Sequence, residues 1–194
     1  MNIRTILTSL SLDLLAAYAV DAQAMATSLE NTLHIMMDLS SLTSGAAMDI
    51  FPSTVDRFLP DVVGGFELIT TAAENEIVVL LVSQEGTAGA RDGKTQRDIC
   101  ENYSGFAEVH RVLMDIIIGK NETLAHGLFD PTTTVRDVLD QLDHRLDLCS
   151  KAVTSLTRST LPLVPVCADG IVHDQESYNE TVEELKSVLR VLLN

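Results

Sequence analysis

The stretch ICENYSGFAEVHRVLMDIIIGK, residues 99–120, carries a long apolar stripe that ends in three consecutive isoleucines. Its apolar side chains recur at spacings of three and four, which is the period of one face of an α-helix. These residues are Ile99, Tyr103, Phe106, Val109, Leu113, Ile116 and Ile117. The pattern predicts a helix whose last turn holds three consecutive isoleucines, in preference to a strand or a membrane segment. Gly119 is expected to end this helix, and Lys120 to lie near the negative end of its dipole.

The same helical period extends over most of the chain. Two further apolar stripes precede residues 99–120 and two follow them, and they run from Leu29 to Leu39, Val55 to Leu80, Val135 to Leu156 and Tyr178 to Leu192. Pro60 and the pair Gly64 and Gly65 predict a kink or a break within the second stripe. The sequence therefore predicts an all-α fold, an antiparallel bundle of four or five helices that forms a single domain over residues 25–194.

Residues 1–24 have the order of a secretory signal peptide. Arg4 precedes an apolar run at 6–20, and Ala22-Gln23-Ala24 forms a small-x-small cleavage pattern. The segment predicts a secreted or cell-wall protein. Asp13 interrupts the apolar run, and the alternative is an ordinary N-terminal helix retained in a cytosolic bundle.

The net charge of the chain is strongly negative, at -15 with a sequence pI near 4.5. Such a charge would be repelled by a nucleic-acid backbone and by an anionic membrane surface, so neither is expected as a partner. After the N-terminal segment no run approaches the ~20 apolar residues that span a bilayer, so no transmembrane anchor is predicted.

Three Asn-x-Ser/Thr sequons fit a secreted protein and are predicted glycosylation sites. They begin at Asn102, Asn121 and Asn179. Asn121 follows the predicted helix end and is the best acceptor, whereas Asn102 lies within a predicted helix and is the poorest.

The three cysteines are Cys100, Cys149 and Cys167, and none has a zinc-type spacing. In an oxidising compartment we expect a disulfide between Cys149 and Cys167 across the proline-containing turn, with Cys100 buried and free. The alternative is three reduced core cysteines in a cytosolic bundle.

No residue pattern indicates an enzyme, and no metal site or cofactor is predicted. Asp140 and His144 share a helix face, but that face is opposite the apolar stripe and is expected to be solvated. Glu108 and His110 diverge on their helix, and His110 is interpreted as a hydrogen-bonded residue at the edge of the stripe. Cys149 has no histidine partner in the sequence pattern.

The apolar helix faces are broad, which is typical either of burial between two neighbouring helices or of a slot for an apolar ligand. The functional hypothesis is a slot between the 99–119 helix and the next long helix. Its predicted lining is Phe106, Val109, Leu113, Ile117, Val138, Leu142 and Leu146. The expected partner is a fatty acid, another lipid or a hydrophobic surface. The alternative is an extracellular protein-interaction or inhibitor-like bundle without lipid binding.

Residues 99–160 also resemble a group of small secreted helical proteins of filamentous fungi. Phe106-x-x-Val109-His110-x-x-Leu113, Ile117-Ile118-Gly119-Lys120 and Val135-x-x-Val138-Leu139-x-x-Leu142 are similar to the ultraviolet-induced fungal proteins. The likeness extends more loosely to the hydrophobic surface-binding protein A and cell-wall galactomannoprotein group. The resemblance implies a secreted or cell-wall-associated helical protein without catalysis, which in some members binds hydrophobic surfaces or fatty acids.

Overall fold

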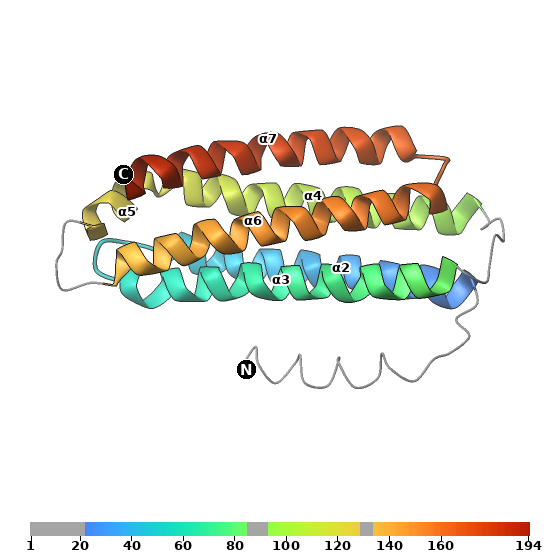
Figure 1. Ribbon diagram of the computed structural model, residues 1–194, viewed down its shortest axis with the longest axis horizontal. Coiled ribbons are helices and arrows are strands. Elements are labelled where there is room, and N and C mark those ends of the chain that lie inside the picture. The colour runs from blue at the N-terminus through green and yellow to red at the C-terminus, as the bar shows by residue number, and fades with distance from the viewer. Residues whose placement is uncertain (1–21, 85–92, 129–133) are drawn as a thin grey trace.

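The computed structural model describes residues 22–84, 93–128 and 134–194, and all its regular elements there are helices (Figure 1). The segment predicted to be a signal peptide lies almost entirely outside the described residues. The helices are α2 (Ala22–Met48), α3 (Val55–Gln84), α4 (Gly93–Gly119), α5 (Asn121–Leu128), α6 (Val135–Thr160) and α7 (Ala168–Leu193), with a short 3-10 helix at Leu161–Leu163. The all-α prediction is confirmed, with five long helices and one short one.

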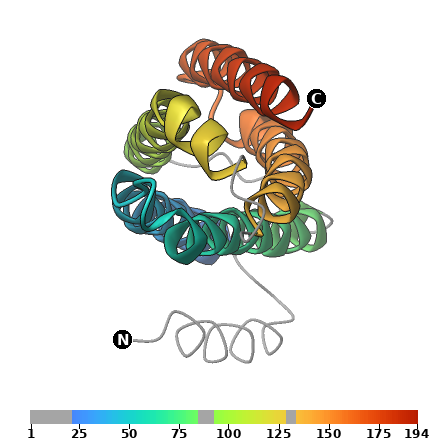
Figure 2. The same cartoon turned by 90° about the vertical axis from the view of Figure 1, so that its left-hand side faces the viewer.

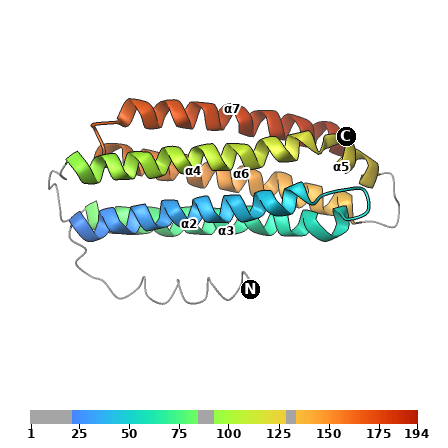
Figure 3. The same ribbon diagram turned by 180° about the vertical axis from the view of Figure 1, so that it is seen from behind.

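The five long helices form a closed ring around one apolar core, as the end view shows (Figure 2). Each helix packs against two others, in the order α2, α3, α6, α7, α4 and back to α2. Consecutive long helices alternate in direction, as predicted. Three pairs of ring neighbours therefore run in the same direction: α2 with α4, α3 with α6, and α4 with α7 (Figure 3). The ring explains the broad apolar faces, because every long helix is buried between two neighbours.

Helix α4 contains the range predicted from its apolar spacing but begins earlier, at Gly93, and it ends at Gly119 as predicted. Lys120 follows Gly119 directly, so it lies at the C-terminal end of α4 as expected, but its ammonium group is bonded to the end of another helix. Its Nζ donates to the carbonyl oxygens of Met48 at 2.8 Å and Ile50 at 2.9 Å, at the C-terminal end of α2. This arrangement follows from the parallel packing of α2 and α4, which brings the negative end of one helix beside a cation at the end of the other.

The short helix α5 is an element that the apolar spacing does not predict. It lies across one end of the ring (Figure 2). Leu124 is fully buried, and the Cα of Gly127 is so close to its neighbours that an added Cβ would lie 3.1 Å from Val135 and 3.3 Å from Val55. Helix α5 therefore closes this end of the core. Within the described helices, no stretch is long and apolar enough to cross a bilayer.

Helix α3 continues through Pro60 and through Gly64 and Gly65, so of the predicted kink or break, the break does not occur. Gly65 serves a close approach of two helices instead. A Cβ on Gly65 would lie 2.8 Å from the Cβ of Thr43 on α2, whereas a Cβ on Gly64 would meet nothing within 4 Å. The glycine pair thus combines one contact position with one open position.

The two adjacent glycines give a matched test of this packing. Gly65→Ala should lower the free energy of unfolding by about 1–3 kcal/mol, because the new methyl group overpacks the contact with Thr43. Gly64→Ala should raise it by about 1 kcal/mol through helix propensity alone. Urea unfolding of both variants measures the difference. Equal stabilisation by the two substitutions would contradict the close α2–α3 contact.

Candidate functional site

The structure places the predicted slot residues within the ring and along its inner edge. Five of the seven are fully buried in the common core: Phe106, Leu113, Ile117, Leu142 and Leu146. Val109 and Val138 are only half-buried. Leu139 occupies the inward position predicted for Val138, because it follows Val135 by four residues and precedes Leu142 by three. Helices α4 and α6 are not ring neighbours, since α7 packs between them. Their side chains meet across the interior.

A connected group of polar side chains lies inside this apolar ring, with one residue from each long helix. We call it the polar layer. Its members are Ser40 on α2, Thr70 on α3, His110 on α4, Cys149 on α6 and Tyr178 on α7, and all five are buried. The layer joins helices that are far apart in the sequence. The spacing of apolar residues could not reveal it, because these side chains occupy ordinary core positions of their helices.

The hydrogen bonds around His110 define where its proton lies. The Ser40 hydroxyl donates to the carbonyl oxygen of Met36 at 2.8 Å, so it must accept the proton of His110 Nδ1, also at 2.8 Å. His110 Nε2 is then an acceptor, and it faces the Cys149 thiol at 3.8 Å. The sequence interpretation of His110 as an edge residue is wrong, because the side chain is fully buried.

Aromatic rings enclose the His110 imidazole. The rings of Phe106 and Tyr178 stack on it, with centroids at 5.4 and 5.6 Å, and Phe66 meets it edge-on at 5.5 Å. Burial among these rings lowers the pKa of His110 to about 3, since the charged form would lose its hydration. Burial likewise raises the pKa of the Cys149 thiol to about 12. The layer is therefore uncharged at neutral pH.

Tyr178 is the unsatisfied member of the polar layer. Its hydroxyl oxygen is buried and has no hydrogen-bond partner in good geometry among the described residues. The Cys149 thiol is a polar neighbour of this hydroxyl and also of Thr70, and Thr70 donates to the carbonyl oxygen of Phe66 at 2.7 Å. A buried hydroxyl without a partner costs free energy, so its retention at this position requires an explanation.

A second buried tyrosine, Tyr103, differs from Tyr178 because its hydroxyl has hydrogen-bond partners. The Tyr103 hydroxyl lies 2.6 Å from Thr157 Oγ1 and donates to Gln175 Oε1 at 2.8 Å, while Gln175 Nε2 donates to Asn179 Oδ1 at 2.8 Å. The network joins α4, α6 and α7. Because Tyr103 is fully partnered, its role is to hold these helices together.

One buried carboxylate lies outside the polar layer. Glu76 on α3 accepts hydrogen bonds at 2.9 Å from Ser28 and from Thr32 on α2, and its other oxygen has no partner among the described residues. Burial raises the pKa of Glu76 above its ordinary value. The sequence does not single out this residue, because it has the spacing of a core position on a helix otherwise lined by apolar side chains.

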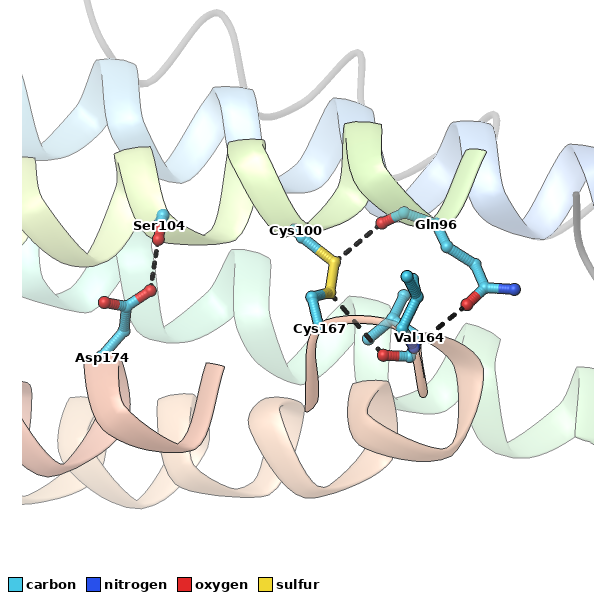
Figure 4. Close-up of a disulfide and its surroundings, with 7 residues drawn as sticks. Gln96, Cys100, Ser104, Val164, Cys167 and Asp174 are labelled. Carbon is cyan, nitrogen blue, oxygen red and sulfur yellow. Dashed lines mark hydrogen bonds between the residues drawn. A yellow bond between two sulfur atoms is a disulfide. The ribbon is translucent and has the colours of Figure 1, made fainter. Parts of the chain in front are cut away.

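The disulfide joins Cys100 to Cys167, with a Cα–Cα distance of 6.4 Å, and Cys149 is free and buried (Figure 4). The predicted Cys149–Cys167 pair is wrong. Cys149 lies eleven residues before the end of α6, which is ~16 Å along the helix axis, whereas a disulfide requires Cα atoms less than ~7 Å apart. Cys100 lies near the start of α4, at the same end of the ring as the α6–α7 turn.

Two further side chains on α4, each four residues from Cys100, also bond to the segment that leads into α7 or to the start of α7. Gln96 Oε1 accepts from the backbone N–H of Val166 at 3.4 Å, and Ser104 donates to the carboxylate of Asp174 (Figure 4). Cys100 lies between them. One face of α4 is thus attached to the start of α7 by a covalent bond and two hydrogen bonds.

The predicted glycosylation residues differ in exposure. Asn121 and Asn179 are exposed, whereas Asn102 is half-buried within α4. Asp140 and His144 are exposed on α6, as expected for a solvated helix face.

A surface pocket of about 280 Å³ lies between α5 and α7, away from the predicted slot. Its lining is Asn121, Glu122, Ala125, Ser187, Val188, Val191 and Leu192. Val191 is 77% exposed, so the pocket opens widely to solvent.

No family model and no curated protein matches the sequence. The fold is similar to that of AFMP4P, whose crystal structure was determined in complex with palmitic acid. The TM-score is 0.69 at 8% sequence identity, and the likeness covers 84% of this chain and 99% of AFMP4P. At this identity the similarity shows the fold alone. The fungal families indicated by the sequence pattern stay a prediction, and the comparison places the chain in the fold of a helical protein with a known fatty-acid complex.

Proposed function

We propose that this protein is a secreted or cell-wall-associated, non-enzymatic binder of single-chain lipids such as fatty acids, which it holds inside the ring of helices. The observation that carries the proposal is the unpartnered Tyr178 hydroxyl in a polar layer surrounded by apolar side chains. An amphipathic lipid would provide both an apolar chain for the core and a hydrogen-bonding group for this hydroxyl.

The fold comparison supports the same ligand class, because AFMP4P has this arrangement of helices and was crystallised with palmitic acid. The ring is filled by flexible and branched apolar side chains, including Met36 and Met114. Methionine adapts readily to a new neighbour, which suits a core that parts to admit a chain. Binding would be driven by the removal of apolar lipid surface from water, at ~25 cal/mol per Å².

Two observations support the secretory part of the proposal. The Cys100–Cys167 disulfide is typical of proteins that fold in an oxidising compartment. The first side chain that the structure describes as buried is Met25, directly after the predicted cleavage site. Cleavage after Ala24 would therefore leave the described core complete.

Native mass spectrometry of the full chain, expressed through a secretory route and incubated with palmitic acid, tests the proposal. The expected result is a mature chain starting near Met25 with one palmitic acid bound, and loss of the lipid on denaturation. A folded protein that retains neither palmitic acid nor the matching alcohol, hexadecan-1-ol, and gives no saturable binding of either would overturn the lipid-binding function. It would favour the protein-interaction alternative, for which the exposed Met48 and Phe51 beside the α2–α3 turn offer an apolar contact surface.

A further inference from the structure

We infer that the polar layer receives the head group of the bound lipid and selects an uncharged head group, a hydroxyl or an un-ionised carboxyl, over a carboxylate. The inference rests on the proposed function and specifies the ligand chemistry of its site. It follows from which hydrogen-bond donors of the layer are not already bonded within the protein.

Four of the five members already use their protons within the protein. Ser40 donates to a backbone carbonyl, Thr70 does the same, and His110 donates through Nδ1 to Ser40. Cys149 faces the acceptor nitrogen Nε2 of His110. The hydroxyl of Tyr178 makes no hydrogen bond of good geometry among the described residues, and its polar neighbour is the Cys149 thiol, a weak hydrogen-bonding group. The layer therefore offers one hydroxyl that a ligand can engage better than the thiol does, and this hydroxyl can donate one hydrogen bond and accept another.

A carboxylate needs more than one donor. Burial of an ionised carboxyl is costly unless a cation or several hydrogen bonds replace its hydration. Among the described residues no Lys or Arg side chain is buried, and the one buried carboxylate, Glu76, would repel an anion. A hydroxyl or an un-ionised carboxyl can donate and accept one hydrogen bond each, which matches the Tyr178 hydroxyl.

The ionisable groups around the site keep this chemistry constant near neutral pH. Helix α4 contributes His110, with a pKa of about 3, and Tyr103, with a pKa of about 12. Helix α6 contributes Cys149, with a pKa of about 12, and burial raises the pKa of Tyr178 on α7 well above its ordinary value. Helices α2 and α3 contribute hydroxyls to the layer, and Glu76 lies six residues beyond the α3 member, ~9 Å along the helix.

Binding of dodecan-1-ol and of dodecanoic acid to the full-length protein, measured across pH in high salt, tests the inference. High salt screens the long-range repulsion between the acidic protein and the carboxylate but leaves the cost of burying a charge. The affinity for the alcohol should be independent of pH above neutrality. The affinity for the acid should fall by about tenfold per pH unit above the pKa of the ligand, because its un-ionised fraction falls at that rate.

Two tyrosine variants locate the head group. Tyr178→Phe removes the unpartnered hydroxyl and keeps the ring, so the affinity for dodecan-1-ol should fall about fivefold, the equivalent of one hydrogen bond. The midpoint of urea unfolding of the ligand-free variant should be equal to or higher than that of the wild type. Tyr103→Phe removes the same atom from a fully partnered tyrosine, so it should lower the unfolding midpoint and leave the alcohol affinity unchanged.

The contrary outcomes separate this inference from the proposed function. Binding of the acid that does not change with pH, or an unchanged alcohol affinity in Tyr178→Phe, would overturn the inference while lipid binding stands. A loss of affinity in Val191→Ser would place the ligand in the surface pocket between α5 and α7 and would also overturn it. Failure of both ligands to bind would overturn the proposed function itself.

Discussion

Replacement of Cys100 by Ala should lower the free energy of unfolding by about 4 kcal/mol. The disulfide to Cys167 closes a loop of 67 residues, and a cross-link of that length removes about this much chain entropy from the unfolded state. Cys167→Ala should have the same effect, and the double variant should be no less stable than either single one, because all three lack the same bond. Urea unfolding of the oxidised proteins measures these values.

Cys149→Ala is the matched control for the disulfide. It removes a buried thiol and its weak contact with His110 Nε2 but leaves the Cys100–Cys167 bond intact, so its cost should be about 2 kcal/mol, from a small cavity and one unsatisfied acceptor. The predicted Cys149–Cys167 pair would give the reverse order, with a large loss in Cys149→Ala and a small one in Cys100→Ala. Peptide mapping without reduction would identify the bonded pair directly.

The sequence alone predicts the helices because each one carries its own periodic signal. The α4 range follows from the spacing of residues 99–117, and its end follows from Gly119. The role of Gly65 could not be predicted, since glycine suggests a break until Thr43 of another helix is known to lie against it. Local patterns report local structure, and tertiary contacts decide the rest.

The pattern of apolar residues does not predict the order of the helices around the ring. The candidate site depends on that order. The expectation that α4 and α6 are direct neighbours fails because α7 packs between them. The predicted Cys149–Cys167 pair fails because Cys149 lies eleven residues before the end of α6, whereas the start of α4 brings Cys100 beside Cys167. Predicting the polar layer would require knowledge that Ser40, His110 and Tyr178 meet inside one ring, although all three lie on correctly predicted helices.

The buried histidine should make the protein sensitive to acid. The pKa of His110 is about 3 in the folded state against an ordinary value near 6.5, so between these values the unfolded state binds more protons than the folded state. The stability from His110 is therefore complete above about pH 6.5 and is lost as the pH falls toward 3. The full loss is about 5 kcal/mol. Urea unfolding at a series of pH values measures it.

His110→Gln should remove most of this acid-dependent loss, because an amide does not titrate. The variant should be less stable than the wild type at neutral pH, where the rings of Phe106 and Tyr178 lose their stacked partner, and the two stability curves should converge as the pH falls. His144→Gln makes the same change on an exposed helix face and should follow the wild-type curve. Burial of Glu76 acts in the opposite direction, because its raised pKa favours the folded state as the pH falls, but this carboxyl is present in all three proteins. If the free energies of unfolding of the wild type and His110→Gln changed in parallel with pH, His110 would take up its proton without unfolding the ring. The layer would then hold a cation in acid, and it would accept a carboxylate.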